Sequence, residues 1–170
     1  MTEVLATERL TLRRPEARDW EAFRAFYMSE RGRNIGSDGT LGRAWRAFAA
    51  EIGHWVIHDF GMWVVTRRGE DRALGMIGPW APADWPETEI GWMIFDPAVE
   101  GTGIAREAAA EAVRHAFDVL GWETAVSYIA PGNDRSIALA ETLGAAHDPQ
   151  AQGPSPEILV YRHPRPEDRA

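Results

Sequence analysis

A glycine-containing loop in the middle of the chain carries the clearest chemical signal in the sequence. It covers residues 100–106 (EGTGIAR) and joins a strand-like run to an amphipathic segment with helical spacing. Glycines let the backbone turn its amides toward a ligand without obstruction by side chains, and a helix start adds unpaired N–H groups and a partial positive charge. The loop therefore predicts an anion site. A turn that allows close packing of strand and helix is the alternative.

Two common phosphate-binding loops are disfavoured by the details of this one. The dinucleotide-binding fingerprint needs a third glycine or alanine where Arg106 stands. That fingerprint also lies near the start of a chain that begins with a strand, whereas this loop lies in the middle of the chain. The loop of nucleoside-triphosphate-binding proteins needs a lysine, and this chain contains none. A nucleotide-dependent oxidoreductase is therefore a weak alternative.

The elements that must position this loop follow from hydrophobic periodicity. Helix 103–120 has an alanine-rich face that begins at Ile104, and helix 133–143 begins after Asn133, a favourable N-cap residue. The order is β-α-α-β-β-β-α-β-α-β. We expect strands over 9–14, 62–66, 74–77, 87–95, 124–129 and 158–163, helices over 17–29, 40–57, 103–120 and 133–143, and one more strand near 145–148.

Two expectations concern how these elements face the rest of the fold. Strand 9–14 stops at Pro15, which suits a strand at the edge of a sheet. Helix 40–57 is amphipathic, and the polar stretch 32–39 before it is expected to be a loop. The apolar residues that helix 40–57 would place on its buried side are Leu41, Trp45, Phe48 and Ile52.

The composition favours one folded domain and disfavours several classes of protein. The 170 residues include 18 arginines and 26 acids, for a formal net charge of −8, which is unfavourable for binding nucleic acid. The absence of cysteine excludes disulfides and thiol catalysis. No apolar run approaches about 20 residues and no signal peptide is visible, so we expect a cytoplasmic protein without a membrane partner. One domain is expected over 1–170, with its core at 7–163 and a charged tail at 164–170.

Four segments carry motifs in a specific order: 7–15 (TERLTLRRP), 89–97 (EIGWMIFDP), 100–108 (EGTGIAREA) and 133–145 (NDRSIALAETLGA). Together they resemble the GNAT superfamily of acyl-CoA transferases, and most closely its branch of Rim-type ribosomal-protein N-terminal acetyltransferases. The resemblance covers nearly the whole chain. It implies a single α+β domain, layered α/β/α, whose central sheet is mixed, mostly antiparallel and splayed, with helices on both sides.

The resemblance also implies which residues bind acetyl-CoA. In this superfamily the glycine loop wraps the pyrophosphate of coenzyme A, and the preceding strand pairs its exposed backbone with the pantetheine arm, where one amide polarises the thioester carbonyl. An asparagine at the start of a later helix contacts the cofactor as well, although Asn133 is also explained by its N-cap role. By position these roles fall on Gly101, Thr102, Gly103, Ile104, Ala105 and Arg106 for the loop, on Met93, Ile94 and Phe95 for the strand, and on Asn133.

Two side chains are candidates for proton transfer. Glu89 stands at the offset where some relatives carry a general base, and alternation places it on the same face as Gly91 and Met93. Ser136 matches a serine that some relatives hold near the sulfur, which makes it a candidate proton donor to the thiolate. The alternatives are an edge charge for Glu89 and a water molecule for Ser136. Tyr128 and Tyr161 are substitutes for a tyrosine that other members use.

Glu100 departs from the superfamily pattern, because many members carry Arg or Gln at this position. A carboxylate here would lie near two phosphates. The uncharged residue that the Rim-type branch often carries favours a Glu100 side chain that points to solvent, and weaker cofactor binding is the alternative.

Aromatic and acidic residues cluster around the loop before the 87–95 strand. In relatives this loop and the two early helices wall the acceptor site, and such a wall suits a cationic amine. Packing in the core and a solvated acidic rim are the alternative reading. The residues are Trp80, Trp85, Trp92, Asp84, Glu87 and Glu89.

The predicted function is an acetyl-CoA-dependent N-acetyltransferase whose acceptor is a protein N-terminus or a small-molecule amine. A non-catalytic acyl-CoA-binding module is the alternative. No metal is expected, because the residue after His54 is Trp55 rather than the glutamate of a zinc helix, and His54 and His58 are read as structural or solvent-facing. Homodimers are frequent among similar proteins, but no residue of this sequence identifies an interface, so the monomer and the homodimer both stay open.

Overall fold

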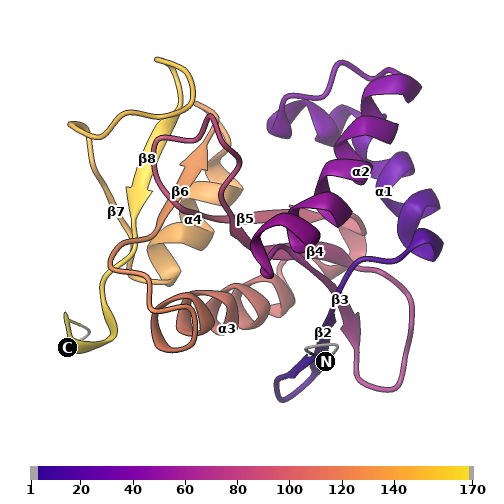
Figure 1. The fold of residues 1–170 in the computed structure, drawn as a ribbon, viewed down its shortest axis with the longest axis horizontal. Coiled ribbons are helices and arrows are strands. Elements are labelled where there is room, and N and C mark those ends of the chain that lie inside the picture. Colours follow the sequence, from indigo (N-terminus) through magenta and orange to yellow (C-terminus); the bar gives the residue numbers. More distant parts are fainter. Residues whose placement is uncertain (1–3, 169–170) are drawn as a thin grey trace.

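One mixed sheet of eight strands runs through the computed structural model, which describes residues 4–168. The strand order is β1-β2-β3-β4-β5-β6-β8-β7, and only β5 and β6 pair in parallel. Helices lie on both sides of it (Figure 1). This confirms the predicted fold class. The strands are β1 (Leu5–Ala6), β2 (Leu10–Arg13), β3 (Trp63–Arg67), β4 (Gly75–Trp80), β5 (Glu89–Ile94), β6 (Val126–Ile129), β7 (Ala146–His147) and β8 (Leu159–Arg162), and the helices are α1 (Trp20–Tyr27), α2 (Leu41–His58), α3 (Ile104–Asp118) and α4 (Asp134–Thr142).

The start of the chain differs from the prediction. The two-residue strand β1 pairs antiparallel with β2, so β2 lies inside the sheet and the expected edge position is wrong. The chain reverses between the two strands through a hydrogen bond from the Thr7 amide to the Leu10 carbonyl (3.0 Å). A short 3-10 helix, Glu30–Ile35, also occupies the first four residues of the expected loop 32–39.

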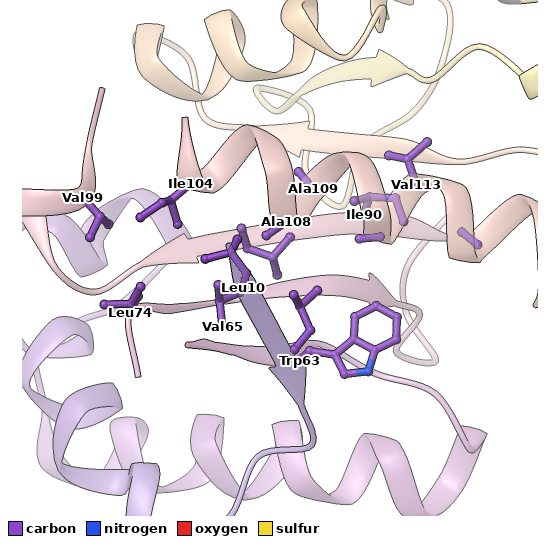
Figure 2. Close-up of a cluster of buried hydrophobic side chains, with 14 of the residues drawn as sticks. Leu10, Trp63, Val65, Leu74, Ile90, Val99, Ile104, Ala108, Ala109 and Val113 are labelled. Carbon is purple, nitrogen blue, oxygen red and sulfur yellow. The ribbon is translucent and has the colours of Figure 1, made fainter. Parts of the chain in front are cut away.

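Helix α3 covers one face of the sheet with its apolar side. Ile104, Ala108 and Val113 are fully buried there against Leu10 of β2 and Ile90 of β5 (Figure 2). The small alanine side chains let the helix axis approach the strands closely, which is why the alanine-rich face of this helix predicted its packing correctly.

Helices α1 and α2 lie together on the opposite face. Phe23 and Phe26 of α1 and Phe48 of α2 pack against Met76 and Met93 of the sheet. Alternation along β5 therefore separates Ile90, on the α3 side, from Met93, on the α1 and α2 side. Glu89 has the same parity as Met93 and faces the two early helices.

The buried side of α2 is not the one that its apolar pattern predicts. Leu41 and Trp45 are 53% and 58% exposed, whereas Glu51 and His54 are buried. Phe48 is buried as expected. The helix is thus rotated so that a carboxylate and an imidazole point into the molecule. Across residues 4–168 no helix has the length and apolar character needed to cross a bilayer.

Candidate active site

Strands β5 and β6 part soon after they meet, which confirms the predicted splayed sheet. Their ladder consists of the pair Glu89–Val126, supported by a hydrogen bond from the Val126 amide to the Thr88 carbonyl (3.1 Å). Beyond this point a cavity of about 1240 Å³ extends from the carboxylate of Glu89 to the glycine loop. The sheet therefore supplies a continuous cleft with two chemically different ends.

The first end is formed by the glycine loop and the start of α4, and we call it the loop end. It is lined by Gly101, Gly103, Ala105, Arg106 and Asn133, all of them predicted site residues. Met93 and Ile94 line the cavity next to it. The structure thus brings together, along one cavity, most of the residues that were predicted to bind acetyl-CoA.

Helix α3 points unused amides into the loop end. Its first hydrogen bond runs from the amide of Glu107 to the carbonyl of Gly103 (3.0 Å), so the amides of Ile104, Ala105 and Arg106 precede the first helical bond. Gly103 is the N-cap and offers no side chain to accept them. These donors and the helix dipole make the loop end a site for an anion.

The glycines of the loop are required by backbone conformation. Gly101 and Gly103 have φ of 73° and 80°, the left-handed region that other residues rarely adopt. Arg9 holds the loop in place, because its Nη1 donates to the Thr102 carbonyl (3.0 Å) and its Nε pairs with Glu107 (2.6 Å).

Two predicted loop residues use their side chains elsewhere. The Thr102 hydroxyl donates to the Val99 carbonyl, and Ile104 is buried in the core under α3. Any ligand contact by these two residues would therefore come from the backbone.

Glu100 is held by two arginines, and the expectation that it points to solvent is wrong. One carboxylate oxygen accepts from Arg31, in the 3-10 helix before α2, and the other accepts from Arg135 in the first turn of α4. Only 24% of its side chain is exposed. Glu100 therefore joins the two walls of the cleft at the loop end, and the arginines neutralise it there.

The open edge of β5 is narrower than predicted. The Phe95 amide donates to the carbonyl of Leu74, the residue just before β4 (2.8 Å), so alternation also directs the main chain of Met93 toward β4. The main-chain groups of Trp92 and Ile94 point the other way, toward the cleft. Of the three residues predicted to offer their main chain to the pantetheine arm, only Ile94 therefore faces the cleft. Trp92, which was not predicted, also faces it.

Ser136 and Asn133 line the cleft from the start of α4. The Asn133 side chain accepts from the Ser136 amide (3.3 Å), which confirms its N-cap role. The Ser136 hydroxyl accepts from the indole Nε1 of Trp92 (3.1 Å). Since that hydroxyl is engaged as an acceptor, its own hydrogen is free to be donated into the cavity.

The second end of the cleft contains two buried glutamates, Glu51 and Glu89, and we call it the carboxylate end. Trp80 and Trp85 line the cavity there as well. Glu89 accepts a hydrogen bond from Trp85 Nε1 (2.5 Å). Burial raises the pKa of Glu89 to about 7, and the hydrogen bond from Trp85 opposes part of that rise. Glu89 therefore exchanges its proton near neutral pH.

The sequence analysis assigned no catalytic or binding role to Glu51, which stands three residues before His54. Glu51 is 6% exposed, and its Oε2 accepts no hydrogen bond from any residue within 4–168. Burial and, after it, the charge of Glu89 raise the pKa of Glu51 to about 8. A count of the charged residues in helix 40–57 could have drawn attention to Glu51, since it is the one acid in that segment.

The aromatic residues of the carboxylate end are fixed by polar contacts. Trp80 stacks on His54 with ring centroids 4.5 Å apart. The imidazole in turn contacts the Phe60 carbonyl through Nδ1 (2.8 Å) and accepts from the Ala81 amide at Nε2 (3.0 Å). Both ring nitrogens are used, which confirms that His54 is a structural histidine, and no group of metal-binding side chains occurs among the described residues.

Comparison with known proteins identifies the family of this fold. The family model for the GNAT acetyltransferase domain matches residues 9–146. The chain belongs to the GNAT acetyltransferase family. An acetyltransferase from Agrobacterium tumefaciens is similar, at 35% identity over 97% of this chain and 96% of that one, with a TM-score of 0.91.

More distant GNAT structures share the fold. A GNAT-family acetyltransferase from Bacillus anthracis is 21% identical over 95% of this chain and 96% of its own, with a TM-score of 0.69. The ribosomal-protein-S5-alanine acetyltransferase from Vibrio fischeri is 14% identical over 99% and 100% of the two chains, with a TM-score of 0.66. Family membership implies an enzyme that transfers an acyl group from acetyl-CoA.

The geometry of the cleft fits this co-substrate of GNAT enzymes. The loop end offers three first-turn amides and the glycine-dependent turn for phosphates. The open edge of β5 offers main-chain groups to an extended arm, and the cavity continues to Glu89.

Several expectations about the acceptor side of this GNAT cleft are corrected. Trp80, Trp85 and Trp92 line the cavity, but Asp84 is exposed outside it. Glu87 is also outside and forms two hydrogen bonds with Arg162 (2.7 and 2.9 Å). The acidic wall consists of Glu89 and Glu51 instead.

The two tyrosines considered as substitutes are placed differently. Tyr128 lines the cavity, and its hydroxyl accepts from the Glu87 amide (3.0 Å). Burial raises its pKa to about 12, so it stays protonated at neutral pH. Tyr161 is buried in a separate cluster around Ile129 and Ala140.

Proposed function

We propose that this chain is an acetyl-CoA-dependent N-acetyltransferase that transfers the acetyl group to a primary amine by direct attack in a ternary complex. The observation that supports this most is the position of Glu89. It is a buried carboxylate at the point where β5 and β6 part, with a pKa of about 7. A general base works best when its pKa lies near the operating pH.

Glu89 is the proton acceptor in this proposal. An amine in the carboxylate end gives its proton to Glu89, directly or through water, and its nitrogen then forms a bond with the thioester carbonyl carbon. The bond from that carbon to sulfur breaks, and the departing thiolate takes a proton. The Ser136 hydroxyl relays it: the hydroxyl gives its hydrogen to the sulfur and takes, directly or through water, the second proton that the nitrogen loses as the amide forms. The indole of Trp92 already donates to that oxygen, which leaves the hydroxyl hydrogen free for the sulfur.

The backbone holds the co-substrate and stabilises charge. Acetyl-CoA supplies the activated acetyl group. The amides of Ile104, Ala105 and Arg106, together with Gly101, Thr102 and Gly103, hold its phosphates, and Asn133 contacts it from α4. The main chain of Trp92 and Ile94 lies at the open strand edge, where an amide can polarise the thioester carbonyl as negative charge develops on its oxygen.

Two acceptor classes remain in this proposal. The motifs that resemble the Rim-type branch favour a protein N-terminus, and two structures of similar fold are named as ribosomal-protein acetyltransferases. The buried acids and the tryptophans favour a small cationic amine. The proposed reaction uses no metal.

The substitution Glu89→Gln tests the proposal against a non-catalytic acyl-CoA-binding module. It keeps the shape of the side chain and the contact with Trp85 but removes the base. We expect amine-dependent release of thiol from acetyl-CoA to fall roughly 10²- to 10⁴-fold. Binding of acetyl-CoA, measured by calorimetry, should stay within about twofold of the wild-type value, because the loop end is untouched.

Glu70→Gln is the matched control, since Glu70 is exposed in the turn between β3 and β4. It should turn over like the wild type. Equal rates for Glu89→Gln and wild type would exclude Glu89 as the base. A wild-type protein that binds acetyl-CoA but transfers nothing to any amine would establish the binding module.

A further inference from the structure

Glu51 is a buried glutamate that lines the cleft, and one of its two carboxylate oxygens has no hydrogen-bond partner among residues 4–168. Its side chain comes from the inward face of α2, lines the cavity and is 6% exposed. Its Oε2 receives no hydrogen bond from residues 4–168. Burial of a charged group without a partner is costly, so a fold that places one beside a cavity leaves an unmet demand for a cation or a hydrogen-bond donor.

The arginines of the cleft do not meet that demand. Three of them line the cavity, Arg31, Arg106 and Arg135, and all three belong to the loop end and its flanks. Arg31 and Arg135 are paired with Glu100. Among the described residues that line the carboxylate end, none carries a positive charge. Glu89 receives polar hydrogens from the indole of Trp85 and from the main chain of Tyr128, and both of these donors are uncharged.

This distribution of charge discriminates between acceptors. A free amino acid would bring its own carboxylate close to Glu51 and Glu89, with no cation to receive it. A monoamine would bring one positive charge to two acids. A molecule with two cationic groups would match both.

The tryptophans of the carboxylate end also favour a cationic acceptor. Trp80 is held by its stack on His54, and Trp85 is held by Glu89. Both line the cavity at this end, and an ammonium group is attracted to the face of an indole. One face of Trp80 is covered by His54.

We propose that the acceptor is a small diamine or other dibasic amine, whose second cationic group binds Glu51 while its reacting amine lies at Glu89. This inference rests on the proposed function, because it assigns the acceptor of the same cleft. Glu51 thereby selects the substrate, and Glu89 takes the proton.

Steady-state kinetics of Glu51→Gln test the inference. A series of α,ω-diamines of increasing length is compared with linear monoamines of the same lengths, with an N-terminal peptide and with a free amino acid. The wild type should prefer one diamine length. Because a hydrogen bond to a charged group is worth about 1.5 to 3 kcal/mol, Glu51→Gln should lower the ratio of diamine to monoamine kcat/KM by about tenfold to hundredfold, mainly through KM.

Two further variants separate recognition from structure. Glu51→Asp keeps the charge and should retain more of the diamine preference than Glu51→Gln. Glu141→Gln, on the exposed side of α4, should keep the wild-type ratio. A purely structural role of Glu51 would change kcat/KM for diamines and monoamines by the same factor in Glu51→Gln.

The outcomes also distinguish this inference from the proposed function. If monoamines or peptides are acetylated and Glu89→Gln is inactive, but Glu51→Gln leaves the diamine preference intact, the inference is wrong and the function stands. A preference for peptides over every diamine overturns it in the same way. If no amine stimulates thiol release, the proposed function itself fails.

Discussion

At the loop end of the cleft, Glu100 lies between the guanidinium groups of Arg31 and Arg135. At the carboxylate end, Glu51 and Glu89 are buried, and no cationic side chain within residues 4–168 pairs with them. All three acids line the same cavity. Where the chain supplies the counter-charge, the acid joins two walls of the cleft. Where it supplies none, burial raises the pKa values of the acids, so that they hold their protons at a higher pH than exposed acids do.

The substitution expected to have the largest effect on acetyl-CoA binding breaks the loop end. Gly103→Val forces a β-branched residue into a left-handed conformation at φ 80° and places its side chain against Arg9. The amides of the first turn then move, and acetyl-CoA affinity should fall by on the order of 100-fold or more in calorimetry. Gly69→Val carries the same conformational strain in the β3–β4 turn, far from the cavity, and should bind normally. Equal losses in both variants would mean general unfolding.

The next prediction concerns the free energy of unfolding of the protein, which depends on pH through Glu51 at the carboxylate end. The pKa of Glu51 rises from 4.5 to about 8 on folding, so between these pH values the folded state holds a proton that the unfolded state has released. Stability therefore decreases as pH rises through this window. Glu51→Gln removes the effect and should be more stable than wild type at about pH 8, by up to about 4 kcal/mol.

Urea unfolding at about pH 5 and about pH 8 checks this. The advantage of the variant should shrink toward the acidic side, and Glu141→Gln should show no such trend. A variant that is less stable than wild type at both pH values would show that Glu51 has a stabilising partner in the fold.

A smaller effect is expected at Ser136. Ser136→Ala removes the hydroxyl, so that only a water molecule can donate a proton to the departing thiolate. We expect kcat to fall by about tenfold, while the KM for the amine changes little. Ser155→Ala, which also removes a hydroxyl that lines the cavity, is the control. An unchanged kcat in Ser136→Ala would assign the proton to water alone.

The smallest effect is expected at Glu100. Glu100→Gln removes the acid that neutralises Arg31 and Arg135, which frees both guanidinium groups for phosphates. Acetyl-CoA should bind about two- to fivefold more tightly, with a steeper dependence on salt. A large loss of affinity would show instead that Glu100 is needed to shape the loop end.

Local rules in the sequence predicted the loop end well. The glycines before α3, the alanine-rich face of that helix and the N-cap Asn133 act within a few residues of chain, and the structure contains each of them. The alternation of β5 likewise predicted the side of the sheet that Glu89 faces.

The carboxylate end could not be predicted in the same way. Leu41 and Trp45 suggested one buried side of α2, but the packing of Phe48 against α1 turns Glu51 and His54 inward, and their burial depends on contacts across the sheet. The partners of Glu100 are equally non-local, because Arg31 and Arg135 come from other elements. The two-residue strand β1 is too short to leave a periodic pattern.

The most direct test of the central claim is amine-dependent release of thiol from acetyl-CoA by the wild-type protein, measured from about pH 5 to about pH 9. The proposed role of Glu89 predicts that release saturates with acetyl-CoA, and that kcat/KM falls as pH falls through an apparent pKa of about 7, because protonated Glu89 cannot accept the proton of the amine. Acetyl-CoA binding without amine-dependent release, or a rate that is flat across this range, would contradict the account.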